Sequence, residues 1–298
     1  MRVTRTFAAT RVGYRGTVAL VPTMGFFHEG HLALIEAARG RADTVVVSLF
    51  INPLQFNDPA DLARYPRDFD RDAALAEAAG ADLLFAPPPE EMYPVPPAVR
   101  VSLPALSAEL EGAHRPGHLD GVAVVVAKLY AGLRPDLAFF GRKDAQQLAL
   151  VARLAADLSF PLEVIGCPTL REQDGLALSS RNVFLAAGDR AAALSLSRGL
   201  LAAADAAEAG ERSGTVLEGV VAAELEAAGL PGAEYVALAD AATATRIPAF
   251  DRPAFLAVAA RVGVVRLIDN IWLDPAGPAD RGARLDRPSL LYAKGEGC

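Results

Sequence analysis

Two histidines, separated by two residues, are the first side chains along this sequence with the types and spacing for chemistry. They lie in His28-Glu29-Gly30-His31, at the predicted start of a helix that follows a strand-like run at residues 17–21. A helix N-terminus presents unpaired N–H groups and a partial positive charge, which suits a phosphate. Both histidines can donate to phosphate oxygens at such a point, and Gly30 leaves space for a close approach. The pattern by itself is equally compatible with two surface histidines at a helix start.

A metal site at these histidines is the weaker interpretation. Zinc sites need three or four clustered ligands. The other two histidines, His114 and His118, are far away in the sequence. The sequence therefore favours phosphate binding over metal binding at His28 and His31.

Three further polar segments each follow a predicted strand. The first, Asn52-Pro53-Leu54-Gln55, offers amides that can donate and accept, as a small polar substrate requires, although it is equally typical of a turn. The second, Gly141-Arg142-Lys143-Asp144 followed by Gln147, offers a mobile cation for phosphates and a second amide, although a single loop lysine more often lies in solvent. The third, Asp174 to Asn182, contains Ser179, Ser180 and Arg181, which can bind a leaving pyrophosphate or simply form a cap and turn.

The common position of these segments is the argument for one site. In open parallel sheets, ligands bind outside the carboxyl ends of the strands, and all four segments lie there. Neither a Walker A loop nor a G-x-G-x-x-G fingerprint is present as a competing phosphate site.

The elements that position these residues alternate between strand and helix patterns. Strands are predicted at residues 17–21, 44–51, 82–86, 99–103, 136–140 and 162–166, and helices at 31–39, 68–79, 120–133 and 144–158. This alternation predicts an α/β fold, a Rossmann-like, doubly wound and mostly parallel sheet.

The remainder of the chain predicts a second, smaller α+β domain. Two alanine-rich helices are expected between residues 186 and 230, broken near 210–214, and strands at 234–239, 255–260 and 264–273. We therefore expect a Rossmann-like ligand-binding domain at residues 1–182 and a C-terminal domain at 183–298. Because Pro, Gly, Asp and Arg dominate from residue 274 onward, that tail is expected to be peripheral or disordered.

The composition narrows the classes of function. The chain has 298 residues, 52% of them hydrophobic, and a net charge of -7, which disfavours a broad nucleic-acid surface. Its two cysteines, Cys167 and Cys298, form neither a disulfide framework nor a metal knuckle. The longest apolar stretch, residues 122–133, is too short to span a bilayer. Arginines near the N-terminus faintly resemble a transit peptide, but the first strand begins too early for a removable leader. A cytoplasmic location is expected.

Six sequence blocks follow one another along the chain: Pro22-Thr23-Met24-Gly25 with residues 28–31, residues 52–56, 64–67, 115–118, 141–147 and 174–182. Taken together, these blocks resemble the pantoate–β-alanine ligase (pantothenate synthetase) family, of the HxGH nucleotidyltransferase superfamily. Residues 267–270 also resemble the C-terminal block of the family. The resemblance spans nearly the whole chain.

The resemblance implies an ATP-dependent ligase that acts in two steps, with ATP and pantoate bound by the domain at residues 1–182. The pantoate carboxylate attacks the α-phosphate of ATP to give pantoyl adenylate and pyrophosphate, and β-alanine then releases AMP and pantothenate. No covalent enzyme intermediate is implied, so catalysis depends on positioning and charge stabilisation. ATP and Mg²⁺ are implied as substrate and cofactor, and a homodimer as the assembly.

The resemblance also implies roles for individual residues. His28, His31, Lys143, Ser179, Ser180 and Arg181 would be catalytic and would bind the triphosphate, together with Met24, Gly141 and Asp144, the last at the ribose. Gln55, Gln147 and the backbone of Met24 would bind pantoate. Asp72 would help to place Mg²⁺, while Tyr65 and Arg115 would support the pantoate pocket or the dimer contact.

This chain departs from the family pattern in three places. Arg142 occupies a position where the family usually has Glu, which reverses a charge beside Lys143 unless a neighbour compensates. Phe26-Phe27 replaces a small polar residue followed by leucine. The tail beyond Leu273 is longer than the family pattern requires and has no assigned role.

Two alternative functions remain open from the sequence. A mononucleotide adenylyltransferase would share the histidine motif and the Ser-Ser-Arg segment, but it would not need Gln55 and Gln147. A non-catalytic nucleotide-sensing protein could keep the fold, although it would not need to keep Lys143 and both histidines. Dependence of pyrophosphate exchange on pantoate distinguishes these alternatives from the ligase.

Overall fold

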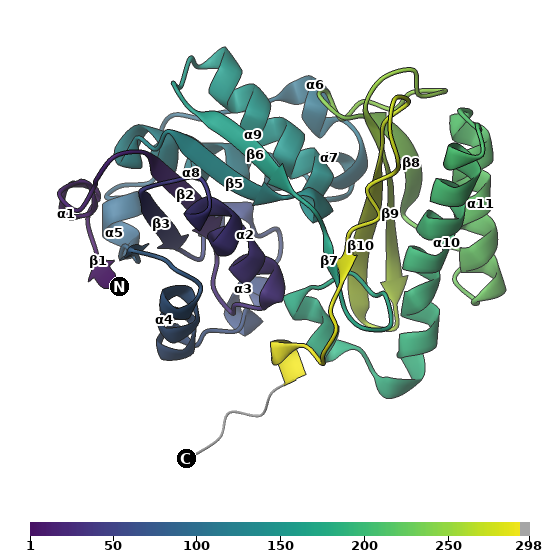
Figure 1. Ribbon diagram of the computed structural model, residues 1–298, viewed down its shortest axis with the longest axis horizontal. Helices are drawn as coiled ribbons and strands as arrows, with labels where there is room; N and C mark the ends of the chain where they lie inside the picture. The colour runs from purple at the N-terminus through teal and green to yellow at the C-terminus, as the bar shows by residue number, and fades with distance from the viewer. Residues whose placement is uncertain (293–298) are drawn as a thin grey trace. The chain divides into compact units, whose positions relative to one another are not determined.

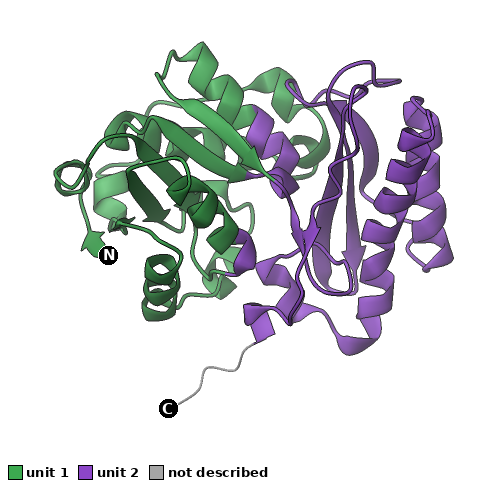
Figure 2. Cartoon of the chain, viewed as in Figure 1, with its two compact units in different colours: residues 1–27, 31–140, 150–167 green, residues 28–30, 141–149, 168–298 purple. Residues whose placement is uncertain are grey.

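The structure, a computed structural model, describes residues 1–292 of the chain, and Cys298 lies outside the described residues. The chain divides into two compact units (Figure 2). Unit 1 comprises residues 1–27, 31–140 and 150–167, and unit 2 comprises residues 28–30, 141–149 and those from 168 onward. This division differs from a single boundary at residue 182, because short segments from the first half of the chain pack with the C-terminal elements.

Unit 1 is built on a six-stranded sheet with the strand order β1-β4-β3-β2-β5-β6 (Figure 1). Its strands are β1 (Arg2–Thr4), β2 (Val18–Thr23), β3 (Thr44–Leu49), β4 (Leu83–Phe85), β5 (Leu137–Gly141) and β6 (Glu163–Cys167). The pairs β1–β4, β4–β3, β3–β2 and β2–β5 are parallel. The expected doubly wound α/β fold is confirmed, and its strand order reverses between β2 and β5.

The helices that connect these strands follow the predicted periodicity closely. The longer ones are α2 (Glu29–Arg39), α4 (Phe69–Ala78), α8 (His118–Leu133) and α9 (Ala145–Asp157). Shorter elements are α1 (Phe7–Arg11), η1 (Pro53–Gln55), α3 (Pro59–Arg64), α5 (Pro89–Met92), α6 (Pro104–Ser107), α7 (Leu110–His114) and η2 (Arg142–Asp144).

Both faces of this sheet are buried. On one face, Val21, Val47 and Phe139 pack with Ile35 of α2 and Ala76 of α4. The intervening residues Leu20, Val46 and Ala138 point to the opposite face and are also fully buried. Strands covered on both sides carry continuous apolar runs, which is why they can be recognised in the sequence.

The sequence prediction was wrong at two short strands. Residues 99–103 form no strand but irregular chain before α6, and Val99 is 76% exposed. Conversely, β1 was not predicted. It has only three residues at the edge of the sheet, and it exists because Arg2, Val3 and Thr4 pair with residues 83–85.

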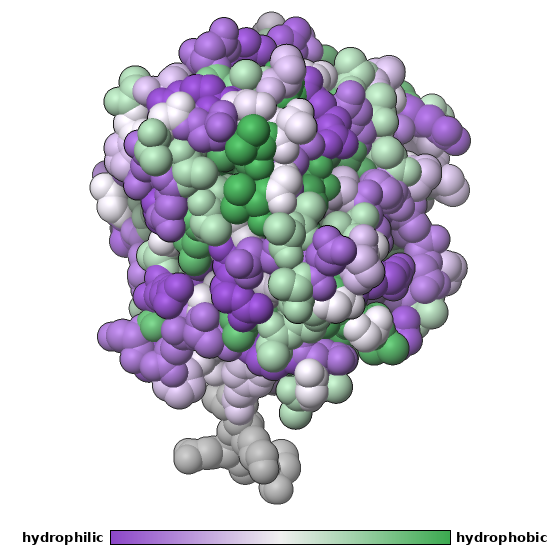
Figure 3. All heavy atoms as spheres, turned by 90° about the vertical axis from the view of Figure 1, so that its right-hand side faces the viewer, coloured by the Kyte–Doolittle hydropathy of each residue, from purple (hydrophilic) through white to green (hydrophobic). Residues whose placement is uncertain are grey.

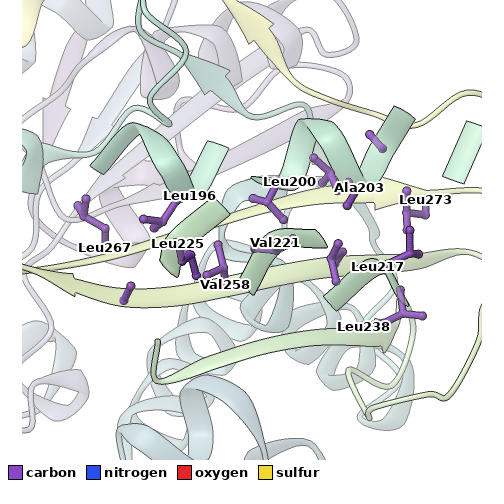
Figure 4. Close-up of a cluster of buried hydrophobic side chains, with 14 of the residues drawn as sticks. Leu196, Leu200, Ala203, Leu217, Val221, Leu225, Leu238, Val258, Leu267 and Leu273 are labelled. Carbon is purple, nitrogen blue, oxygen red and sulfur yellow. The ribbon is translucent and has the colours of Figure 1, made fainter. Parts of the chain in front are cut away.

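Unit 2 contains a three-stranded antiparallel sheet and two helices. The sheet has the order β10-β9-β8, with β8 (Tyr235–Asp240), β9 (Ala254–Val262) and β10 (Val265–Leu273). Helices α10 (Arg190–Glu208) and α11 (Gly214–Ala227) pack on it through an aliphatic core (Figure 4). Gly263, with φ of +57°, turns the chain between β9 and β10 in a two-residue hairpin.

Small elements join the outer parts of unit 2. They are β7 (Leu170–Arg171), η3 (Ser180–Phe184), η4 (Ala187–Asp189), β11 (Ala283–Arg284) and η5 (Leu290–Tyr292). The fully buried guanidinium of Arg171 donates to both carboxylate oxygens of Asp269, at 2.6 and 3.1 Å. This paired buried charge connects β7 to β10.

The part of the tail that the structure describes, residues 274–292, is folded, although its composition is typical of peripheral or disordered segments. β11 pairs in parallel with β7, and Ser289 and Leu291 are buried. Composition alone missed this order because the stabilising partners of the tail lie in distant parts of the chain.

The outer surface of α11 carries small apolar side chains. Figure 3 views the chain from the side on which α11 lies in Figure 1, and apolar residues gather in the middle of that face. Exposed residues of α11 include Val216, Ala222 and Ala223.

Among residues 1–292, no helix has both the length and the apolar character needed to cross a membrane.

Candidate functional site

A tight turn connects β2 to the start of α2. Met24 is half-buried directly after β2, and the next two residues, Gly25 and Phe26, have φ of +89° and +53°. This left-handed backbone is ordinary for Gly25 but strained for Phe26. An external group must therefore hold the turn in place.

Asp72 of α4 is that group. Its Oδ2 accepts the N–H of Phe26 at 2.6 Å and its Oδ1 accepts the N–H of Phe27 at 2.7 Å. Burial raises the pKa of this carboxyl, while the N–H groups of Phe27 and Phe26 act in the opposite direction. Arg71 supports the same turn, because its Nη1 donates to the Phe27 carbonyl at 2.9 Å and its guanidinium lies over the Phe26 ring.

These contacts bear on the expected metal role of Asp72. A Mg²⁺ ligand needs an oxygen facing the ion, with water or phosphate completing an octahedron. Asp72 is 1% exposed and directs both oxygens at backbone amides. Within residues 1–292, no group of three or more His, Cys, Asp or Glu is arranged to hold a metal ion. The geometry fits a turn-holding role for Asp72 better than direct ligation of Mg²⁺.

The two histidines occupy the first turn of α2 and the residue before it. His28 is 8% exposed, and its Nδ1 accepts the N–H of Gly30 at 3.1 Å. A neutral ring with this acceptor carries its proton on Nε2, the tautomer that can donate through Nε2. The ring of His31 packs on Phe27 with a centroid separation of 5.3 Å. The first turn of the helix therefore orients the His28 ring, and Phe27 of the preceding turn packs on the His31 ring.

Gln55 is held by a buried polar network in unit 1. Its Oε1 accepts from Asn52 Nδ2 at 3.0 Å, and the same Asn52 amide donates to the Gly121 carbonyl at 3.0 Å. His118 Nδ1 donates to the Gln55 carbonyl at 2.8 Å, and Arg115 Nη1 lies 3.0 Å from His118 Nε2. Sequence spacing could not identify the role of His118, because the residue that it binds lies 63 positions away in another element.

Tyr65 lies next to this region of the chain. It follows α3, and its ring packs edge-on against Phe56 at 5.6 Å. Tyr65 thus orders the loop after η1, which is consistent with a supporting position rather than a chemical one.

Lys143 lies in η2, an element that begins directly after Gly141 at the end of β5. Its carbonyl accepts from Asn270 Nδ2, and the carbonyl of Arg142 accepts from Trp272 Nε1 at 3.2 Å. The backbone of η2 is thereby fixed to β10, while the Lys143 side chain is half-exposed. Asp144 is exposed, and Gln147 is half-buried in the first turn of α9.

Ser179 and Ser180 lie where the chain enters η3. Ser179 Oγ accepts the N–H of Arg181 at 3.2 Å, as an N-cap does. The next residue, Asn182, donates to Glu172 Oε1 at 2.6 Å and to the Ala177 carbonyl at 3.0 Å. Glu172 was not predicted, and no local pattern distinguishes it.

The division of the chain groups most of the predicted phosphate-binding residues. Unit 2 contains His28, Gly141, Lys143, Asp144, Gln147, Ser179, Ser180 and Arg181. Unit 1 contains Met24, His31, Gln55 and Asp72, with Tyr65 and Arg115. Most of the residues expected to bind phosphate therefore pack within unit 2, although His31 and Met24 lie in unit 1 and the amide of Gln147 lies in unit 2.

Comparison with known proteins identifies the family. A family model described as pantoate-beta-alanine ligase matches residues 2–272. The chain belongs to this family. A pantothenate synthetase from Roseiflexus sp. (strain RS-1) is 46% identical over 277 residues, covering 92% of this chain and 100% of the relative. The ligase activity expected from the sequence is confirmed at this level: the chain is an enzyme that joins pantoate to β-alanine.

Solved structures of the pantoate-beta-alanine ligase family support the same assignment. Pantothenate synthetase from Thermus thermophilus matches with a TM-score of 0.85 and 47% identity, covering 92% of this chain and 99% of that one. Pantoate-beta-alanine ligase from Francisella tularensis, complexed with beta-gamma ATP and beta-alanine, matches with a TM-score of 0.70 and 29% identity. This match covers 93% of this chain and 98% of the Francisella chain.

The structure also accounts for Arg142, which departs from the family pattern. Its Nη1 donates to Asp280 Oδ2 at 2.6 Å, and its guanidinium lies 5.3 Å from the centroid of the Trp272 ring. Both partners are partly shielded from solvent, so the charge of Arg142 is paired rather than left beside Lys143. Asp280 is the compensating neighbour that the reversed charge requires.

Proposed function

We propose that this chain ligates pantoate and β-alanine through a pantoyl-adenylate intermediate, with ATP as the second substrate. In the first step, a pantoate carboxylate oxygen bonds to the α-phosphorus of ATP and the bond to the bridging oxygen breaks, releasing pyrophosphate. In the second, the β-alanine amine bonds to the acyl carbon, the bond to AMP breaks, and the amine loses a proton to solvent. AMP and pantothenate are the products.

The observation that carries this proposal is the combination of family membership with a phosphate-binding residue set in one unit. His28, Lys143 and Arg181 supply donors and positive charge, with Ser179 and Ser180 as hydroxyl donors. The Francisella relative, complexed with beta-gamma ATP and beta-alanine, supports the same two substrates here. Charge stabilisation of this type is often the largest single contribution to catalysis.

The resemblance to the family suggests roles for the remaining predicted residues. His31 would donate to the same phosphates as His28, and Met24 and Gly141 would line the ATP site through their backbones. Asp144 would accept from the ribose hydroxyls, while Gln55 and Gln147 would bind the hydroxyls and carboxylate of pantoate. Mg²⁺, when bound with ATP, would neutralise phosphate charge, and Asp72 would hold the turn at residues 25–27.

The experiment that tests the proposal is exchange of labelled pyrophosphate into ATP by the purified chain, without β-alanine. Exchange that requires pantoate supports the adenylate. Exchange that requires a nucleoside monophosphate would indicate an adenylyltransferase, and no exchange under conditions in which pantothenate forms would exclude a free adenylate. Light scattering of the same sample tests the proposed homodimer, and cell fractionation tests the proposed cytoplasmic location.

A further inference from the structure

The C-terminal segment, residues 274–292, lies outside the part of the chain that the family model matches. That match ends at residue 272. The alignment with the Roseiflexus relative covers the whole of that relative but only 92% of this chain. The segment is nevertheless folded: it returns along β10, pairs through β11 with β7, and ends in η5 (Figure 1). It therefore requires an explanation that the family core does not provide.

The first part of the segment contacts η2. Asp280 pairs with Trp272 of β10 through backbone hydrogen bonds in both directions, at 3.1 and 2.8 Å. Its carboxylate, placed in this way, binds the guanidinium of Arg142 at 2.6 Å. Arg142 is the residue before Lys143, so the segment stabilises the position of the backbone that carries the lysine.

The end of the segment contacts the histidine motif. Ser289 Oγ donates to Glu29 Oε2 at 2.7 Å, and the N–H of Leu290 donates to Glu29 Oε1 at 2.7 Å. Glu29 and Ser289 are both buried, at 7% and 5% exposed. Glu29 directly follows His28, and both of its carboxylate oxygens accept from the segment. A negative charge beside predicted phosphate ligands is thus held in one orientation.

The last described residue contacts the base of the Ser-Ser-Arg segment. Tyr292 Oη donates to Glu172 Oε1 at 3.1 Å, the same oxygen that accepts from Asn182. Arg190 Nη2 donates to the other oxygen of Glu172 at 2.6 Å. Asn182 follows Arg181, so this network stabilises the backbone from which Ser180 and Arg181 project.

We infer that the C-terminal segment is a positioning element for ATP, which aligns the three chain segments that carry His28, Lys143 and Arg181. The inference rests on the proposed function, because it assigns those residues to the triphosphate. Ser289 is a positioning residue and not a catalytic one: it touches Glu29, which is adjacent to His28. The three chain segments are far apart in sequence, and each has a polar partner in residues 280–292.

The test uses the full chain and compares Ser289→Ala with Ser289→Thr, which retains a hydroxyl. Ser102→Ala, at an exposed position, and Asp286→Asn, at an exposed position of the same segment, are the matched controls. We expect Ser289→Ala to lower kcat/KM for ATP by about 10-fold, because small displacements of catalytic groups can cost up to about 100-fold. The KM for pantoate should stay within about twofold of the wild type, and Ser289→Thr should restore most of the loss.

The inference is overturned if Ser289→Ala and Asp286→Asn have the same kcat/KM for ATP. It is also overturned if Ser289→Ala raises the KM for pantoate as much as that for ATP, since a general loosening of the fold would do this. Failure of the wild type to support pantoate-dependent exchange would instead refute the proposed function, so the two failures are distinguishable.

Discussion

Replacement of Asp72 by Asn tests whether this carboxylate holds the turn before α2. Asp72 accepts two backbone N–H groups, at 2.6 and 2.7 Å. An asparagine side chain retains one acceptor oxygen, so one N–H would face an amide donor. Loss of a hydrogen bond to a charged group costs about 1.5–3 kcal/mol, and a buried unpaired N–H costs about 1–3 kcal/mol.

Part of that cost is offset. Burial raises the pKa of Asp72, which means that the surroundings penalise its ionised form, and a neutral side chain avoids this penalty. We therefore expect Asp72→Asn to lower the free energy of unfolding by about 2–3 kcal/mol. Because Phe27 of this turn packs on the ring of His31, kcat/KM for ATP should also fall, by about 100-fold.

The assay is urea unfolding at pH 7 with an unchanged m-value, alongside pyrophosphate exchange. Asp70→Asn is the matched control, because Asp70 lies in the first turn of the same helix but is exposed. Gly25→Ala is an independent variant that should disturb the same turn. Its Cβ would lie 2.9 Å from Asp72 Oδ2, and the backbone at residue 25 has a φ of +89°. If Asp72→Asn unfolds within about 0.5 kcal/mol of the Asp70→Asn control, the turn-holding role is refuted.

Three further predictions concern separate parts of the chain. Lys143→Ala should slow pyrophosphate exchange by about 100- to 1000-fold while leaving the unfolding free energy nearly unchanged, and near-normal exchange would contradict its assigned role. Gly121→Ala would place a Cβ 2.2 Å from the Leu54 carbonyl, so it should destabilise the chain by about 1–3 kcal/mol in urea although alanine normally favours a helix. At Asp240, burial raises the carboxyl pKa, but hydrogen bonds from Arg252 and from nearby N–H groups lower it more. Asp240→Asn should therefore cost about 1 kcal/mol at pH 7. Its deficit against the wild type should shrink as the pH falls below about 4, the ordinary Asp pKa, because the unfolded carboxyl then binds more protons than the folded one, whose pKa is lowered. A deficit that stays constant from pH 7 to pH 3 would contradict this.

Much of the fold could be predicted because its signals are local. The runs at residues 17–21 and 44–51 are strands with both faces buried, so nearly every side chain is apolar. In the helices at residues 31–39 and 120–133, apolar residues recur three and four positions apart, which indicates the buried face of each helix. The four strand-following segments could likewise be predicted, because motif and strand end lie within a few residues of each other.

The features that were predicted wrongly or missed depend on residues that are distant in the sequence. A strand was predicted at residues 99–103 from a β-prone run, and β1 was missed, because a short strand depends on a partner that its own residues do not specify. The single boundary expected at residue 182 also differs from the grouping of residues in the two compact units. Residues 28–30 and 141–149 belong with the C-terminal elements, through hydrogen bonds such as that from Asn270 to Lys143.

The sequence by itself determined which residues have the chemistry: two histidines, a lysine, a Ser-Ser-Arg segment and two amides, in the order of the pantoate-beta-alanine ligase family. Only the tertiary structure decided how these residues are held. Asp72 binds the turn before His28, His118 binds Gln55, and Ser289 binds Glu29 across 260 positions of the chain. Residue type and local periodicity are properties of neighbours in sequence. A hydrogen bond between distant residues depends on where folding brings two elements, and neither element records this in its own pattern.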